Sequence, residues 1–270
     1  MSDERQEITT RREGNRPVNG FQEKTVHIWG CGGLGSWIAE FIARAGASTI
    51  TVCDPGTITG GLLVRQNYTE ADIGQTKADA LATRLRAIRD DLTITIAEGN
   101  IPDPTVALCA DVIIDATVSH SITTYLDTLA SKNSTAFIAQ VATDAKTGTL
   151  GIVNICAPGA ACTPSELDDQ AGRSAMADSG LELYHQFWKE TAEGDELVPT
   201  RGCSVPTFHG SAADLAAVAA TLVNMIGLHL QQAEAPVSGT HLIALPHAPD
   251  GPRHHFIPAA RDVRGQGGTR

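Results

Sequence analysis

The chain has 270 residues, of which 42% are hydrophobic, and its formal net charge at pH 7 is −11. Its length suits one α/β domain built around a single core. Such an acidic chain lacks the basic footprint that a nucleic-acid backbone or an anionic membrane requires, so neither is an expected partner. The start of the sequence is polar and charged, without the pattern of a signal peptide. Together with six scattered cysteines, it predicts a cytoplasmic protein with reduced thiols.

The first predicted elements are a strand over 25–29, a glycine-rich turn and a helix over 34–45. A short apolar strand of this kind is typical of a buried parallel sheet. Glycines let the backbone approach a phosphate, and the helix N-terminus supplies N–H groups and the positive end of a dipole. The turn therefore predicts a nucleotide site whose glycines are Gly30, Gly32, Gly33 and Gly35.

A second strand is predicted over 49–53, and Asp54 follows it about 20 residues after the last glycine, where an acid binds ribose hydroxyls. The next predicted elements are a helix over 75–89, strands over 92–97 and 112–116, a helix over 119–131, and strands over 136–142 and 149–155. This alternation predicts a Rossmann-like, doubly wound, mostly parallel sheet with helices on both faces. Ligands bind such sheets at the carboxyl ends of the strands, where Gly30, Asp54 and Asp115 fall.

The later part of the chain changes character. Residues 156–202 are rich in Pro, Gly, Ala and acids, with one helix-like piece over 181–191, and we expect a functional crossover loop. An Ala-rich apolar helix over 212–230 is expected to be buried and not to span a membrane. A strand over 241–245 follows. The predicted organisation is an N-terminal arm (1–24), one domain (25–260) and a C-terminal tail (261–270).

The segment between Asp54 and Lys77 resembles the ubiquitin-activating superfamily, which includes the bacterial adenylyltransferases ThiF and MoeB. The family pattern is a G-x-G-G-x-G turn, an Asp, then N-L-x-R-Q and D-I-G-x-x-K. This chain matches it at the four glycines and at Asp54, Arg65, Gln66, Asp72, Ile73, Gly74 and Lys77. The similarity is strong over residues 26–82 and is traceable to about Leu230.

The resemblance implies ATP- and Mg²⁺-dependent adenylation of the C-terminal carboxylate of a ubiquitin-like or sulfur-carrier protein. Asp54 would bind the ribose. Arg65 would grip the phosphates through its guanidinium fork, with Gln66 beside it, and Lys77 would act as a point charge on them. The resemblance also implies a homodimer and a downstream conjugating enzyme. In the family a basic residue of the partner subunit's N-terminal arm touches the triphosphate, and the candidates here are Arg5, Arg11, Arg12 and Arg16.

Two positions depart from the family pattern. Leu62 stands where the family has the Asn of N-L-x-R-Q, and Val118 stands where it has a magnesium-binding Asp. Asp115, three residues before Val118, could hold the metal directly or through water, or it could be structural and cap the next helix. These departures leave open a subunit that binds ATP without catalysis.

Cys203 precedes the long apolar helix, in a segment similar to that of the acyl-accepting cysteine in single-domain activating enzymes. The helix dipole and Arg201 would stabilise its thiolate, which can attack an acyl adenylate to give a thioester. Cys162, within the crossover loop, is the competing acceptor. No C-x-x-C pair occurs, and the C-x5-C spacing of Cys156 and Cys162 does not favour a zinc site.

Two other functions keep the same nucleotide site. An adenylyltransferase of this fold acting on a tRNA base or a small peptide needs no acceptor thiol. A nicotinamide-dependent dehydrogenase also uses a glycine turn followed by an acid, although the cationic pattern of Arg65 and Lys77 favours a triphosphate.

Overall fold

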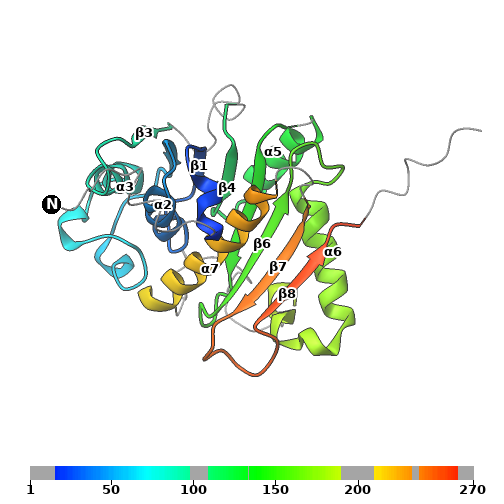
Figure 1. Ribbon diagram of the computed structural model, residues 1–270. Coiled ribbons are helices and arrows are strands. Elements are labelled where there is room, and N and C mark those ends of the chain that lie inside the picture. The colour runs from blue at the N-terminus through cyan, green and yellow to red at the C-terminus, as the bar shows by residue number, and fades with distance from the viewer. Residues whose placement is uncertain (1–15, 98–108, 133, 190–209, 233–236, 261–270) are drawn as a thin grey trace, which may run out of the picture.

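The computed structural model describes residues 16–97, 109–132, 134–189, 210–232 and 237–260. Within these residues eight strands form one sheet, in the order β3-β2-β1-β4-β5-β6-β7-β8 (Figure 1). The strands are β1 (Thr25–Trp29), β2 (Thr49–Cys53), β3 (Thr93–Ile96), β4 (Val112–Asp115), β5 (Phe137–Thr143), β6 (Leu150–Cys156), β7 (Gly239–Ala244) and β8 (His254–Pro258). The first five in this order are parallel, and β6, β7 and β8 are antiparallel to their neighbours.

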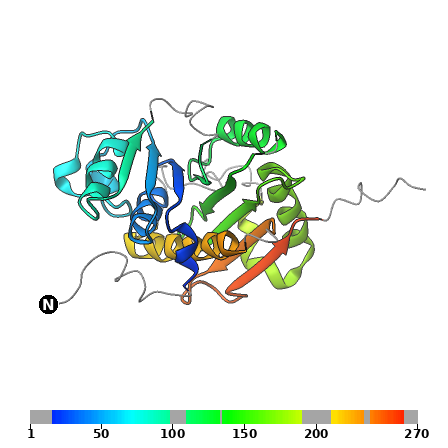
Figure 2. The same cartoon turned by 45° about the horizontal axis from the view of Figure 1, so that its top comes forward.

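Helices cover both faces of the sheet (Figures 1 and 2). The α-helices are α2 (Gly35–Arg44), α3 (Lys77–Arg86), α5 (His120–Ser131), α6 (Pro164–Ala177) and α7 (Ala212–Gln231), and the 3₁₀ helices are η2 (Pro17–Phe21), η3 (Gly60–Leu62), η4 (Glu70–Asp72) and η5 (Ser179–Phe187). The apolar residues of α2, α3 and α7 pack on one face, and those of α5, α6 and η5 pack on the other. The predicted Rossmann-like class is confirmed.

The register of the parallel strands builds one functional edge. Trp29, the last residue of β1, is level with Cys53 of β2 on one side and with Asp115 of β4 on the other. The next residues, Gly30 and Asp54, therefore leave the sheet beside each other. This is the crevice that parallel α/β sheets use for ligands.

The crossover region is more ordered than the sequence indicates, because residues 164–187 form α6 and η5. Thr163 and Glu166 form a capping box, and Pro164 occupies the first turn, where its missing N–H costs nothing. The helix was not predicted because its buried side is made of small residues. Gly172 lies against the ring of Trp188, which a Cβ at that position would meet at 2.8 Å.

The predicted N-terminal arm joins the domain before Thr25. η2 packs across the C-terminal part of α7, where Cβ atoms at Gly20 and Gly227 would overlap the opposing backbone carbonyls. Phe21 is fully buried in the core. β8 is a second element absent from the predictions, and it pairs with β7 along the edge of the sheet.

Among the described helices, α7 alone has the length and apolar composition to cross a membrane. Its residues Leu215, Val218, Leu222 and Ile226 are fully buried against the sheet, α2 and η2. α7 is thus the buried core helix that the sequence predicts.

Candidate functional site

The glycine turn leaves β1 in a conformation that only glycine adopts easily. Gly30 has a φ of +85°, and its N–H donates to the carbonyl of Cys53 at 2.8 Å. A Cβ at Gly35 would collide with the Gly30 carbonyl, so the helix can begin this close to the strand only without a side chain. The N-cap residue Leu34 makes no side-chain hydrogen bond to the first turn of α2. The turn thus brings backbone N–H groups to the carboxyl edge of the sheet.

Asp54 joins this turn to the next loop. Its Oδ2 accepts the N–H of Cys31 at 2.8 Å, and its Oδ1 accepts the N–H of Gly56 at 2.8 Å. Lys77 Nζ lies 3.7 Å from Oδ2, with both side chains largely buried. A carboxylate offers about four lone-pair directions, so Asp54 retains acceptor capacity for ligand hydroxyls.

A cavity of about 260 Å³ lies directly against these groups. It is lined by the glycine turn, the end of β2 with Asp54, Lys77, and the segment from Ala116 to Ile122. The predicted residues Gly30, Asp54 and Lys77 are therefore brought together around one space.

Tyr68 was not predicted, yet it fixes two parts of this cavity to each other. Its hydroxyl lies 2.7 Å from the carbonyl oxygen of Cys31 and 3.2 Å from that of Lys77, and it donates to both. The ring is buried, and burial is the main reason that the pKa of Tyr68 is raised far above its ordinary value. No sequence pattern relates the three residues, because Tyr68 lies 37 positions from Cys31.

Arg65 and Gln66 are also buried, but they lie beside the cavity and do not line it. Neither the nitrogen nor the oxygen of the Gln66 side-chain amide has a hydrogen-bond partner among the described residues, although Gln66 is only 2% exposed. An unsatisfied buried amide is costly, and native structures contain few of them. Gln66 thus holds buried polar capacity that the described chain does not use.

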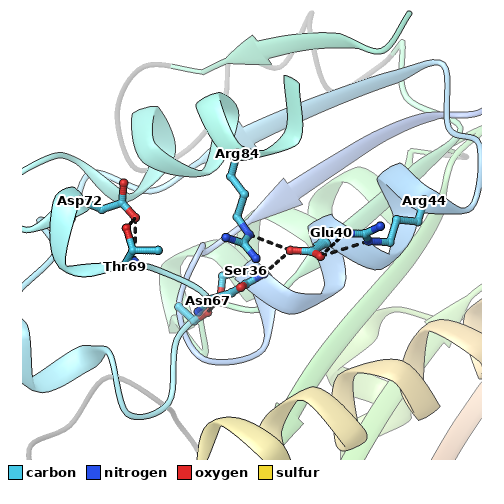
Figure 3. Close-up of polar contacts among 8 residues, drawn as sticks. Ser36, Glu40, Arg44, Asn67, Thr69, Asp72 and Arg84 are labelled. Carbon is cyan, nitrogen blue, oxygen red and sulfur yellow. Dashed lines mark hydrogen bonds and ion pairs between the residues drawn. The ribbon is translucent and has the colours of Figure 1, made fainter. Parts of the chain in front are cut away.

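Helix α2 holds the segment after Gln66 in place (Figure 3). The Asn67 N–H donates to Ser36 Oγ at 3.1 Å, and Asn67 Nδ2 donates to Glu40 Oε2 at 2.7 Å. Glu40 also accepts from Arg44 and from Arg84 of α3, each at 2.7 Å. Burial opposes ionisation of Glu40, but the hydrogen bonds from Asn67, Arg44 and Arg84 outweigh it and lower its pKa to about 2.

The predicted metal ligand Asp115 has a structural role in this chain. Its Oδ1 accepts the N–H and the hydroxyl of Thr117 at 2.9 and 2.6 Å, and its Oδ2 accepts from Gln140 Nε2 at 2.9 Å. Burial raises the pKa of Asp115 despite these bonds, and the residue does not line the cavity. Within the described ranges no three His, Cys, Asp or Glu residues are grouped to hold a metal ion. Asp115 thus makes the contacts of a structural residue, and its role as a magnesium ligand stays a prediction.

The turn that Asp115 stabilises contains Val118, the residue at the family's magnesium position. Val118 has a φ of +56°, which is unusual for a β-branched residue, and its side chain is 42% exposed. A strained backbone at the rim of the cavity marks this turn as a variant part of the site.

The structure describes one of the two candidate acceptor thiols. Cys203 lies outside the described residues, as do Arg201, Arg5, Arg11 and Arg12, so their roles stay predictions. Cys162 is half-buried beside Cys156 at the start of α6 and does not line the cavity. Arg16 is described, and its carbonyl accepts Gln231 Nε2 at 2.7 Å.

The ThiF family matches residues 7–236 of the chain. The tRNA threonylcarbamoyladenosine dehydratase of Escherichia coli (strain K12) is 31% identical over 100 residues, which are 37% of each chain. The ubiquitin-like modifier-activating enzyme 5 of Bombyx mori is 33% identical over 87 residues, covering 31% of this chain and 22% of that protein. The molybdopterin-synthase adenylyltransferase of E. coli (strain K12) is 30% identical over 88 residues, covering 32% and 35%. The matched segments span between 22% and 37% of the length of these curated relatives.

Solved structures agree in fold. The crystal structure of E. coli MccB with ATP superposes with a TM-score of 0.61 at 16% identity, covering 92% of this chain and 67% of that one. The complex of MccB with AMPCPP and the MccA peptide gives the same TM-score, identity and coverage. Because the family match extends over most of the sequence, the chain belongs to the ThiF family.

Proposed function

We propose that this protein is an ATP-dependent adenylyltransferase that activates the C-terminal carboxylate of a ubiquitin-like or sulfur-carrier protein. The observation that carries the proposal is the meeting of the glycine turn, Asp54 and Lys77 around one cavity. The ATP complex of MccB, a protein of the same fold, supports ATP as the nucleotide.

The proposed reaction joins two anions, so the site must neutralise charge. A carboxylate oxygen of the carrier attacks the α-phosphorus of ATP, an acyl-adenylate forms, and pyrophosphate leaves. The side chain of Lys77 is 10% exposed and lies against the Asp54 carboxylate. Its ammonium group is available to the departing phosphates. A positioned cation in a partly dehydrated site stabilises the charge that builds on the leaving group. Asp54 would hold the ribose.

The direct test is ATP–pyrophosphate exchange that depends on an added ubiquitin-like carrier. We expect Lys77→Ala to lower the exchange rate by about 100-fold or more, the usual cost of removing one group that stabilises a transition state. Lys132→Ala, which removes an exposed lysine at the far end of α5, is the control and should exchange at the wild-type rate. Full exchange in Lys77→Ala would contradict the role of Lys77, and the absence of exchange in the wild type would favour a subunit that only binds ATP.

We further propose that the acyl group passes to Cys203, as the resemblance implies. The thiolate would attack the acyl carbon of the adenylate, forming a thioester and releasing AMP. Cys203→Ala should retain exchange but lose a carrier adduct that is sensitive to reducing agent on a non-reducing gel. An adduct that persists in Cys203→Ala and disappears in Cys162→Ala would move this role to Cys162.

A second candidate function is adenylation of a tRNA base or a small peptide without an acceptor thiol. The similarity to the tRNA threonylcarbamoyladenosine dehydratase and the fold shared with peptide-bound MccB favour it. A Cys162→Ala, Cys203→Ala double variant with full product formation would support this candidate over the first. A homodimer, a downstream conjugating enzyme, bound Mg²⁺ and a cytoplasmic location are proposed on the family resemblance and the composition alone.

A further inference from the structure

Two thiols meet where β6 ends and α6 begins. Cys156 is the last residue of β6, and Cys162 directly precedes the N-cap residue Thr163. The five residues between them turn back on themselves: the Ala160 N–H donates to the Ala157 carbonyl at 3.1 Å, and Gly159 has a φ of +67°. This turn returns Cys162 to the hydrophobic cluster that contains Cys156, where the two thiols interact.

The Cys162 sulfur has a second donor. Ser238, just before β7, accepts the N–H of Ala157 on its Oγ at 2.9 Å, and its hydroxyl hydrogen-bonds the Cys162 sulfur. Ser238 is itself nine-tenths buried, so its position is fixed by packing. Cys162 is thus held by groups from two other strands and is not a lone surface thiol.

The surroundings of the two sulfurs give them different pKa values and different exposure. The hydrogen bond from Cys156, with help from Ser238, outweighs burial and the charge of Glu166 and lowers the pKa of Cys162 to about 7. The same hydrogen bond and burial raise the pKa of Cys156 far above its ordinary value. Cys156 is 2% exposed, whereas Cys162 is partly open to solvent. At pH 7 about half of the outer sulfur is therefore thiolate, whereas the inner one stays a thiol.

We propose that Cys156 and Cys162 form a redox pair in which a hydroperoxide oxidises Cys162 and Cys156 closes an intramolecular disulfide. The Cys162 thiolate attacks the terminal oxygen of the peroxide, the O–O bond breaks, and an alcohol or water leaves, giving a sulfenic acid. The Cys156 sulfur then displaces the hydroxyl of that sulfenic acid and loses its proton, and water leaves. In total two thiols and one hydroperoxide give one disulfide, one alcohol or water, and one water.

The pair also gives a role to Cys162, a thiol that does not line the nucleotide cavity. β6 runs antiparallel to β5, so Cys156 is level with Ile138, near the start of β5. The cavity lies at the opposite edge, past Asp115, which is level with Gln140. Oxidation of this pair is thus chemically separate from the adenylation that we propose at the cavity.

The test treats the full chain with hydrogen peroxide, blocks remaining thiols with N-ethylmaleimide, and maps the digested peptides by mass spectrometry. We expect a Cys156–Cys162 disulfide, two hydrogens lighter than the thiol pair, to form before the exposed Cys109 is oxidised. Oxidation of Cys109 first, or a Cys162 that stays reduced, would overturn the proposal.

A second measurement does not depend on disulfide formation. At pH 7 a thiol of pKa about 7 is half ionised, against about 3% for an ordinary cysteine. Cys156→Ala should therefore slow iodoacetamide alkylation of Cys162 by about tenfold, whereas Cys109→Ala should leave it unchanged. Under peroxide, Cys156→Ala should leave a sulfenic acid at Cys162 that dimedone traps. Equal alkylation rates in Cys156→Ala and the wild type would contradict the hydrogen bond on which the pair depends.

Discussion

A few single side chains fix the segments around the cavity relative to one another. Asp54 and Lys77 could be predicted, because each belongs to a recognisable pattern and the carboxyl ends of parallel strands meet at one edge. Tyr68 could not be predicted, since it acts through two backbone carbonyls whose positions depend on the complete fold. A hydroxyl that joins segments distant in sequence produces no periodic pattern in the sequence from which it could be predicted.

We predict that Tyr68→Phe destabilises the protein by about 1–2 kcal/mol and weakens ATP binding. The change removes the O–H that bridges the Cys31 and Lys77 carbonyls, and the loss of a buried hydrogen bond is costly. It also frees the glycine turn at Cys31 from the start of α3 at Lys77. Urea unfolding and calorimetric titration with a non-hydrolysable ATP analogue measure the two effects.

Tyr184→Phe is the matched control for Tyr68→Phe. Tyr184 is fully buried, and its hydroxyl donates to a single carbonyl, that of Pro252, at 2.6 Å, away from the cavity. We expect it to lose stability without loss of nucleotide affinity. An equal loss of affinity in both variants would mean that Tyr68 affects binding only through global stability.

At the scale of elements, those with a local sequence pattern could be predicted, and those that depend on distant partners could not. Strands β1 and β2 are buried and mostly apolar, and α2 and α3 carry an apolar stripe, so the sequence places them within a few residues. Most of the buried residues of α6 are small, so its buried face shows little apolar pattern. β8 is defined by its pairing with the edge of β7. Both depend on partners that a local pattern does not contain.

The contact between α2 and α3 passes through one carboxylate, Glu40, and we predict that Glu40→Gln costs about 1–3 kcal/mol at pH 7. Glutamine keeps an acceptor oxygen but loses the charge that Arg84 and Arg44 contact. The folded pKa of about 2 lies below the ordinary 4.5. The stabilisation is therefore present above about pH 4.5 and is lost as the pH falls toward 2.

Denaturant unfolding of both proteins between pH 7 and pH 3 measures this dependence. The difference in free energy of unfolding between the wild type and Glu40→Gln should be constant at higher pH and shrink below about pH 4.5. Glu182→Gln, at an exposed glutamate of η5, provides the reference for removing a surface charge. A difference that does not change with pH would show that Glu40 contributes through packing and not through its ionised form.

At the scale of the whole molecule, one helix ties the two halves of the sheet together. α7 packs on β5, β6 and β7 and also contacts α2, which covers the parallel half (Figures 1 and 2). η2 lies across the same helix, so the segment before β1 closes the core from outside. The predicted arm covers this segment, whose sequence is polar and charged. Gly20 and Gly227 let it pack on α7, since both helices need glycine where their backbones touch.

We predict that Gly227→Val destabilises the protein by about 1–3 kcal/mol, the range for overpacking a close contact. The new side chain overlaps the Pro17 carbonyl, so η2 must move away from α7 and expose Phe21. Leu228→Val, at an exposed position one residue along α7, accounts for the helix cost of a β-branched residue. Unfolding curves should show the larger loss in Gly227→Val, and limited proteolysis near residues 17–21 should accelerate in that variant alone. Because no residue of η2 or α7 lines the cavity, ATP affinity measured in the folded population should be retained. A fall in affinity that matches the loss of stability would instead mean that α7 transmits the position of η2 to the nucleotide edge.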